Sequence, residues 1–317
     1  MQEQNSPIVG HAQQIMTQVR KAVVGKDDVL LWALAAILAG GHILMEDIPG
    51  VGKTTMALAF SKALSLEQNR MQFTPDVLPS DVTGYSILDQ QTGQMVYRPG
   101  AVLCNLFLAD ELNRATSRTQ SALLEAMEEG QVTVDGVTHR LPAPFIVIAT
   151  QNPTGAAGTQ LLPDSQMDRF MVRLSLGYPS CKDEIAMIRD RQGAEPLKQV
   201  QSVVTARELV LLRQAVKETF IGEEVTAYTV NLIQATRSDE NLLRGASPRA
   251  TLAVVAMAKA VAQLRGRTYV VPRDVQEVLA PTLCHRLQLT HTAQSQGLSA
   301  EEILQQIRAR VPAPKLR

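Results

Sequence analysis

A glycine-containing segment near the start of the chain has the residue types that phosphate binding requires. It reads DIPGVGKTT over residues 47–55 and follows a short apolar run, 43–45, which we interpret as a buried strand. Glycines in such a loop expose successive backbone N–H groups, and the next helix directs its partially positive end at the same point. Lys53 adds a flexible positive charge, and the Thr54 hydroxyl suits Mg²⁺ as an oxygen ligand. We expect the phosphates of a nucleotide to contact Pro49, Gly50, Val51, Gly52, Lys53, Thr54 and Thr55.

One position departs from the strict form of this loop. The strict pattern has glycine five residues before Gly52, where this chain has Asp47. The loop alone therefore leaves a second interpretation open, which is an ordinary glycine-rich turn between a strand and a helix.

A pair of carboxylates follows the apolar run 106–109, which we interpret as a central strand. Asp110 and Glu111 would stand at the mouth of a buried strand, where their repulsion and their loss of water are both unfavourable. A Mg²⁺ ion and a reacting water would relieve both effects. We assign Asp110 to the metal, and Glu111 to the general base that assists attack on a γ-phosphate. The alternative is that the pair only caps the next helix.

A third apolar run, 145–149, leads into Thr150, Gln151 and Asn152. Ligands of parallel sheets bind beyond the carboxyl ends of the strands, so an amide at this point would orient water or contact the γ-phosphate. We assign that role to Asn152. The alternative is that Asn152 only forms a turn, because asparagine before proline often starts a turn.

Two arginines complete the candidate site. Ser247, Pro248 and Arg249 fit the first positions of a helix, where a cation is unfavourable and a phosphate contact would explain it. A solvated side chain is the alternative for Arg249. Arg169, just before the run 171–174, is a candidate arginine finger for the nucleotide of a neighbouring subunit, although its spacing alone cannot show this.

The order of elements indicates an α/β fold. Short apolar runs alternate with helical patterns, which predicts a parallel sheet with helices on both faces. We expect five strands, at 43–45, 71–73, 106–109, 145–149 and 171–174. The segment 75–100 is expected to be an inserted loop or short hairpin. A second hairpin is expected over 131–141, which alternates around Asp135 and Gly136.

The remainder of the chain has helical patterns only. We expect helices at about 182–192, 205–219, 223–236, 248–265, 272–285 and 300–310. The sequence thus predicts a first α/β domain over 1–179 and a second, all-helical domain over 180–317. The connection at 177–180 is the expected hinge.

Composition bounds the class of protein. The chain has 317 residues, 45% of them hydrophobic, and its 31 basic residues balance its 31 acidic residues. Nucleic acid is therefore an unfavoured partner. The longest apolar run, 29–39, is too short to span a membrane, and the polar N-terminus lacks a signal core. The cysteines have no metal-type spacing and are expected to be reduced core residues, so we expect a cytoplasmic protein.

Several strings together resemble the AAA+ ATPases, and within them the MoxR family. They are EDIPGVGKT at 46–54, DELNRA at 110–115, ATQNP at 149–153, QMDRF at 166–170 and GASPRA at 245–250. The resemblance covers nearly the whole chain and implies an AAA+ P-loop NTPase core, a five-stranded parallel sheet between helices, with a small helical C-terminal lid. One departure is the neutral segment 154–158, where the family usually has acidic residues.

The resemblance also implies roles for single residues. Lys53 and Thr54 correspond to the Walker A motif, and Asp110 and Glu111 correspond to the Walker B motif. The roles of sensor 1, arginine finger and sensor 2 fall to Asn152, Arg169 and Arg249. ATP and Mg²⁺ are the implied cofactors, with ATP between the core and the lid.

The family further implies a ring, expected as a hexamer, that remodels or matures a client protein. Its usual partner has a von Willebrand factor A domain, its clients are often metalloenzymes that await a cofactor, and its insert and hairpin line the central pore. Three alternatives stay open at this point. They are a motor subunit of a magnesium chelatase or gas-vesicle system, a DNA-acting AAA+ machine, and a nucleotide-gated scaffold without turnover.

Overall fold

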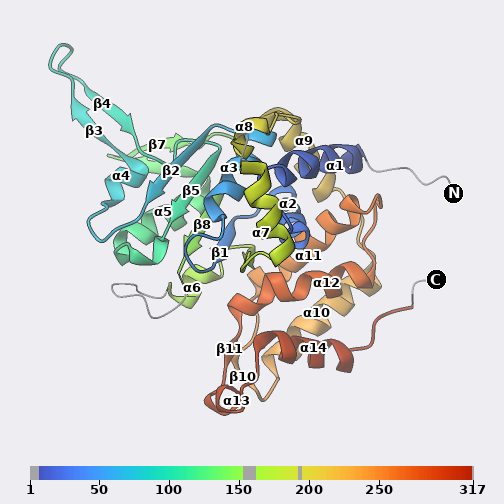
Figure 1. Cartoon of the computed structure of the whole chain (residues 1–317). Coiled ribbons are helices and arrows are strands. Elements are labelled where there is room, and N and C mark those ends of the chain that lie inside the picture. Colours follow the sequence, from blue (N-terminus) through green and yellow to red (C-terminus); the bar gives the residue numbers. More distant parts are fainter. Residues whose placement is uncertain (1–6, 153–161, 192–194, 316–317) are drawn as a thin grey trace.

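The computed structural model describes residues 7–152, 162–191 and 195–315 (Figure 1). The neutral segment 154–158, where the sequence departs from the family pattern, lies outside these ranges. The centre of the molecule is a five-stranded sheet in the order β2-β5-β8-β1-β9, and its pairings are parallel. The strands are β1 (Ile43–Glu46), β2 (Gln68–Gln72), β5 (Leu106–Asp110), β8 (Ile146–Gln151) and β9 (Val172–Leu174). The predicted parallel sheet is confirmed.

Burial separates the central strands from the edge. β5 and β8 are buried along their whole length, as their continuous apolar sequences predict. The edge strand β2 consists mainly of exposed polar residues, and it begins at Gln68, earlier than the expected range 71–73. The apolar residues that predicted this strand stand only at its end, because most of its other side chains face solvent.

Helices cover both faces of the sheet. Leu108 and Ile148 pack into one hydrophobic cluster, and the adjacent residues Phe107 and Val147 pack into the other. This follows from the alternation of side chains along a strand. The helices that take part are α1 (Pro7–Arg20), α2 (Asp27–Ala39) and α3 (Lys53–Ala63) on the first face and α5 (Ser117–Glu129) on the second.

Two hairpins extend the core. The insert contains α4 (Pro79–Thr83), β3 (Gly84–Leu88) and β4 (Met95–Pro99), and the second hairpin is β6 (Gln131–Val134) with β7 (Val137–Arg140). The β3–β4 hairpin projects far from the body of the molecule (Figure 1). The ring of Tyr97 stacks on that of His139, with centroids 3.7 Å apart, which joins the bases of the two hairpins. Both hairpin predictions are confirmed as structure.

The C-terminal part is the predicted helical lid, with one small sheet added. Its helices are α7 (Cys181–Arg191), α8 (Pro196–Gln199), α9 (Ala206–Lys217), α10 (Glu223–Arg237), α11 (Pro248–Leu264), α12 (Pro272–Leu283), η2 (Cys284–Arg286), α13 (His291–Ser295) and α14 (Ala300–Arg310). The short strands β10 (Leu242–Arg244) and β11 (Gln288–Leu289) pair antiparallel, so the domain is not helical throughout. Each strand has too few residues to give an alternating sequence pattern.

Core and lid share one hydrophobic cluster. The apolar helix α2 packs against α9 and α11 of the lid, and α12 packs against β9. The run 29–39 is thus a buried helix, as expected, and within the described ranges no helix is long and apolar enough to cross a membrane. Of the three cysteines, Cys104 and Cys284 are buried, but Cys181 is exposed at the start of α7, which corrects the expectation that all three are core residues.

Candidate active site

The glycine-containing loop has the backbone that its sequence predicts. Gly50 and Gly52 have φ angles of +87° and +100°, a left-handed conformation that favours glycine. Gly52 immediately precedes α3, so the free N–H groups of the first helical turn face the loop. The Lys53 ammonium donates a hydrogen bond of 2.6 Å to the carbonyl oxygen of Asp47. The lysine is thereby held beside the loop.

Asp47 has a structural role that the strict motif does not contain. Its buried carboxylate accepts hydrogen bonds from the backbone N–H groups of Leu176 and Gly177, and the Gly177 bond measures 3.1 Å. Its own N–H donates to the Gln151 carbonyl at the end of β8. Asp47, the residue that departs from the strict motif, therefore connects the loop with the segment that follows β9.

The two carboxylates lie at the end of β5, where they were expected. Asp110 is buried; it accepts a hydrogen bond of 3.2 Å from the Thr150 hydroxyl and one of 2.7 Å from Arg70 Nε. Thr150 Oγ1 also accepts the backbone N–H of Glu111 at 2.9 Å. Neither Thr150 nor Arg70 was singled out from the sequence, although the position of Thr150 at a strand end next to Asn152 was an available signal.

Glu111 is placed by a left-handed residue conformation and by two side chains. Its φ of +54° is unusual for a residue other than glycine. Asn152 Nδ2 donates to Glu111 Oε1 at 3.1 Å, and Arg114 Nη1 donates to Oε2 at 3.0 Å. The structure therefore brings the predicted base and the predicted amide into direct contact.

The charges around Lys53 favour an ionised base. The hydrogen bond from Arg114, followed by that from Asn152, lowers the pKa of Glu111 in spite of partial burial. Burial lowers the pKa of Lys53, against the attraction of Asp47, Asp110 and Glu111. Arg70 and Arg114 pair with Asp110 and Glu111, so the side-chain charges beside Lys53 are balanced and the fit of a cation rests on the oxygen atoms at this point. The oxygen atoms of Asp110 and Thr54 suit Mg²⁺, which commonly uses few protein ligands together with phosphates and water.

The two arginines lie on the side of the sheet where the strands begin, opposite the side that carries the glycine loop. Arg169 precedes β9, and the N–H of Met171 bonds the carbonyl of His42 at the start of β1, whereas the glycine loop follows the end of β1. Arg249 lies beside Arg169, because both side chains pair with the carboxylate of Glu128, Arg169 at 2.9 Å. Arg249 thus contacts Glu128 in this structure, and its contact with a phosphate stays a prediction.

The attachment of the lid explains where Arg249 lies. Asp168 accepts hydrogen bonds from Arg286 at 3.0 Å and from Ser247 at 2.9 Å, and Ser247 is the N-cap of α11. These contacts hold the first turn of α11, and with it Arg249, against the residue next to Arg169. Sequence reasoning missed Asp168, Arg286 and Glu128 because their partners lie far along the chain.

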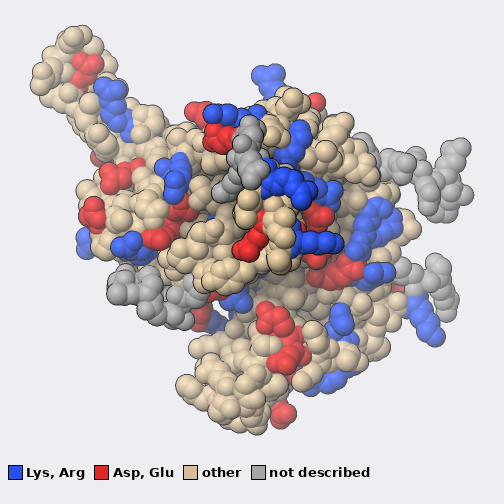
Figure 2. Space-filling view, in the orientation of Figure 1, with Lys and Arg blue, Asp and Glu red and all other residues tan. Residues whose placement is uncertain are grey.

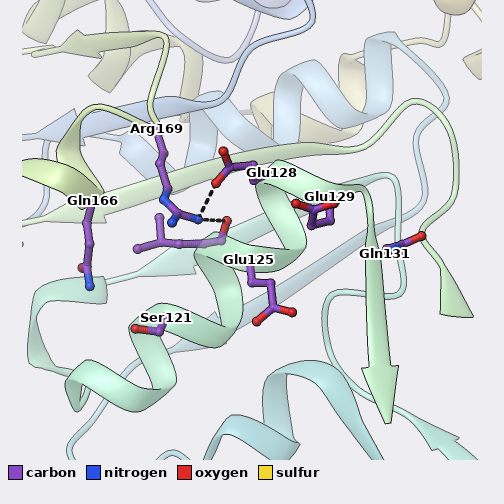
Figure 3. Close-up of a pocket in the computed structure, with 8 residues that line it drawn as sticks. Ser121, Glu125, Glu128, Glu129, Gln131, Gln166 and Arg169 are labelled. Atoms are coloured by element: carbon purple, nitrogen blue, oxygen red, sulfur yellow. Dashed lines mark hydrogen bonds and ion pairs between the residues drawn. The ribbon is translucent and has the colours of Figure 1, made fainter. Parts of the chain in front are cut away.

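A cavity of about 490 Å³ opens next to Arg169. Figure 3 shows the arginine side chain between Glu128 and the main chain of α5, where it donates a hydrogen bond of 2.8 Å to the Leu124 carbonyl. The cavity is lined by Ser121, Leu124, Glu125, Glu128, Glu129, Gln131, Gln166 and Arg169. An anchored guanidinium at an open surface suits a contact with a second molecule.

The fold and the site define an AAA+ ATPase. Residues 42–172 match the family described as "ATPase family associated with various cellular activities (AAA)", and residues 234–307 match the family described as "AAA lid domain".

Within this class, the chain belongs to the MoxR family. It is 37% identical to Chaperone MoxR1 of Mycobacterium tuberculosis, over 94% of this chain and 81% of that protein. It is 42% identical to the protein YeaC of Bacillus subtilis, over 99% of this chain and 97% of that protein. A crystal structure of a protein from Cytophaga hutchinsonii has a TM-score of 0.90, an identity of 37% and a coverage of 96% of each chain.

Proposed function

We propose that this chain hydrolyses ATP in the presence of Mg²⁺ at the loop that ends in Lys53. The observation that carries the proposal is the contact between Glu111 and Asn152 at the carboxyl ends of two adjacent strands, beside the glycine loop. In this arrangement residues 49–55 bind the phosphates, while Thr54 and Asp110 hold the metal. When bound, Mg²⁺ would neutralise charge on the phosphate oxygens.

Glu111 is the proposed general base. Its lowered pKa keeps the carboxylate ionised at neutral pH, and a lone pair that the bonds from Asn152 and Arg114 leave unused would accept the proton from water. The water oxygen forms a bond to the γ-phosphorus, the bond from that phosphorus to the β-bridging oxygen breaks, and the proton moves to Glu111. ADP and phosphate leave. Asn152 holds one carboxylate oxygen and orients it toward the water.

The site needs a second subunit in this proposal. Arg169 and Arg249 lie at the opposite edge of the sheet from the loop, and their side chains are 31% and 44% exposed. In the structure both side chains are held by Glu128 on α5. We place both arginines at the nucleotide of a neighbouring subunit in a ring, with a hexamer as the expected form.

Mixed rings test this placement. Arg169→Ala should lose turnover and keep its affinity for ATP, because the loop of its own chain is intact. Mixed with Lys53→Ala subunits, it should recover turnover at the interfaces where an intact loop meets an intact arginine. Mixtures without any recovered turnover would contradict the placement in trans.

The hydrolysis itself is tested by release of phosphate from ATP. We expect release by the parent chain with Mg²⁺, none with EDTA, and a loss on the order of 10²-fold or more in Lys53→Ala. Lys62→Ala is the matched control, since Lys62 lies on the same helix and donates to the carbonyl of Leu197. Equal rates in Lys53→Ala and the parent would refute the proposal.

The work of the ring is the remodelling or maturation of a client protein. The similarity to a relative named as a chaperone favours this over the chelatase motor and the DNA-acting machine. On the β3–β4 hairpin the apolar side chains of Tyr85, Leu88 and Met95 are more than half exposed, and the hairpin carries few charges in Figure 2. An exposed apolar hairpin fits a protein ligand. A partner with a von Willebrand factor A domain and a cytoplasmic location complete the proposal.

Capture on Glu111→Gln tests the client. In ATP and Mg²⁺ this variant should hold its ring and its client together, and mass spectrometry should find a protein that is absent when ATP is omitted. Recovery of DNA alone would contradict the chaperone function. Leu88→Ser with Met95→Ser should reduce the capture without a change in ATP binding.

A further inference from the structure

Each polar group of Asp47 is bonded to a different part of the site. Its carbonyl oxygen accepts the Lys53 ammonium at 2.6 Å, and its N–H donates to Gln151 at 3.3 Å. Its carboxylate, in a residue that is 6% exposed, accepts the N–H groups of Leu176 and Gly177. A buried charge with several donors is strongly held. Asp47 thus joins the phosphate lysine, the strand of Asn152 and the chain beyond β9.

The segment that Asp47 holds is the connection between the core and the lid. Residues 175–180 run from the end of β9 to the start of α7, and Gly177 has a φ of +59° there. Lys26 donates to the carbonyl of Tyr178 at 2.8 Å, so the segment is also tied to the start of α2. A glycine at position 47, as in the strict motif, has no side chain that could reach these amides.

We propose that Asp47 is a positioning residue that transmits the occupancy of the nucleotide loop to the core–lid connection. This inference rests on the proposed function, because it requires ATP in the loop. When the phosphates bind, the Lys53 ammonium is drawn toward them and its bond to the Asp47 carbonyl weakens, while the phosphates fix the loop through its N–H groups. Because the carboxylate belongs to the same residue as that carbonyl, its grip on Leu176 and Gly177 changes with the loop.

The connection is joined to Arg169 through β9. β9 has three residues, with Leu176 and Gly177 beyond its end and Arg169 before its start. A displacement at the end of β9 is therefore passed to the arginine that acts on the neighbouring site. In this way the nucleotide in one subunit would adjust hydrolysis in the next.

A merely structural Asp47 would behave differently. If the carboxylate only stabilised the fold, its loss would lower stability equally with and without nucleotide. A coupling role instead alters how the connection responds to nucleotide, and lowers kcat with little change in KM. The protection of the Leu176 and Gly177 amides from hydrogen exchange reports that response directly.

The test compares hydrogen exchange of the full chain with and without a non-hydrolysable ATP analogue and Mg²⁺. In the parent chain the analogue should slow exchange at Leu176 and Gly177 by roughly tenfold. Asp47→Gly, which restores the strict motif, should bind the analogue within about threefold of the parent, lose this protection and lose kcat by roughly tenfold. Asp47→Asn, which keeps the volume without the charge, should lie between them.

Asp183→Ala is the matched control. Asp183 also accepts a backbone N–H of the connection, that of Ser180 at 3.3 Å, but it belongs to α7 and has no bond to the loop. In the Asp183→Ala variant the analogue should slow exchange at Leu176 and Gly177 as it does in the parent. A parent that hydrolyses ATP without any change at Leu176 and Gly177, or an Asp47→Gly variant with parental kcat and protection, would overturn the inference alone. A parent that neither binds nor hydrolyses ATP would overturn the proposed function as well.

Discussion

Arg169 of the core and Arg249 of the lid are bound to the same carboxylate, that of Glu128 on α5. Arg169 is also anchored to the Leu124 carbonyl, and its Nε is buried without a hydrogen-bond partner among the described residues. The two guanidinium groups would repel each other without the shared anion. The lid and the core therefore present their arginines as one unit.

Glu128→Gln should separate Arg169 from Arg249, because it removes the negative charge that both arginines share. We expect kcat to fall by roughly tenfold while the Kd for ATP stays within about threefold of the parent, because the nucleotide loop is at the other edge of the sheet. Steady-state kinetics and nucleotide titration measure the two quantities. Glu129→Gln removes a neighbouring carboxylate of the same cavity and should act as the parent does. A kcat equal to that of the parent in Glu128→Gln would show that the shared carboxylate has no part in turnover.

Arg114→Ala should move the acid limb of the pH profile. The Arg114 hydrogen bond is the main cause that lowers the pKa of Glu111, so its removal raises that pKa. As the pH falls, the variant should then lose kcat at a higher pH than the parent. Arg118→Ala, an exposed arginine at the start of α5, is the control. Superimposable profiles of parent and Arg114→Ala would argue against Glu111 as the titrating base.

His42 makes stability depend on pH. Its Nδ1 accepts the N–H of Val147 at 2.9 Å and its Nε2 lies 3.1 Å from the Met127 carbonyl. Removal from water lowers the pKa of His42 from 6.5 to about 4, in spite of the Met127 bond. The unfolded chain therefore binds the extra proton between these two values, and the free energy of unfolding falls as the pH falls through that window.

His42 lowers the free energy of unfolding by up to about 1.4 kcal/mol for each unit by which the pH falls in this window. His42→Gln can keep both hydrogen bonds without titrating, so its denaturation curves should lose less stability between about pH 6.5 and pH 4. His285, whose pKa burial also lowers, contributes in the same direction and remains in the variant. Parallel losses in parent and variant would contradict the assignment.

Asp274 is the buried anion of the lid. It is fully buried and accepts hydrogen bonds from both Nη atoms of Arg267, at 2.7 and 2.6 Å, from Arg265 at 3.2 Å and from the Val271 N–H at 2.9 Å. Asp274→Ala should lower the free energy of unfolding by about 1–3 kcal/mol, since the Val271 N–H and two partly exposed arginines lose their acceptor.

Chemical denaturation measures this loss, with Arg273→Ala as the comparison. Arg273 pairs with Glu277 in an exposed position, and such pairs contribute about 0–1 kcal/mol. Similar losses in the two variants would show that burial does not decide the strength of the Asp274 cluster.

The sequence predicted the elements whose signals are local. β5 and β8 were recognisable because strands covered on both faces are continuously apolar, and the loop before α3 because its glycines and Lys53 are adjacent. The sequence placed Glu111 and Asn152 at the ends of two strands, and the adjacency of β5 and β8 in the structure brings them into contact.

Contacts between distant segments could not be predicted in this way. Asp47 appeared as a mismatch because its partners, Leu176 and Gly177, lie at the far end of another strand. The position of Arg249 depends on how the lid packs against α2 and on the bond of Ser247 with Asp168, neither of which has a periodic signal. The sequence located the arginine at the start of its helix, but it carried no signal for where that helix packs.

The rate of phosphate release by Glu111→Gln tests the account most directly. This variant keeps the shape of the side chain and its contact with Asn152, but it cannot accept a proton. We predict that it binds ATP within about threefold of the parent and that its multiple-turnover rate falls by a factor on the order of 10² or more. Glu125→Gln, on the exposed side of α5, should keep the parental rate. A Glu111→Gln chain that turns over ATP as fast as the parent would contradict the assignment of Glu111 as the base of an ATP-hydrolysing site.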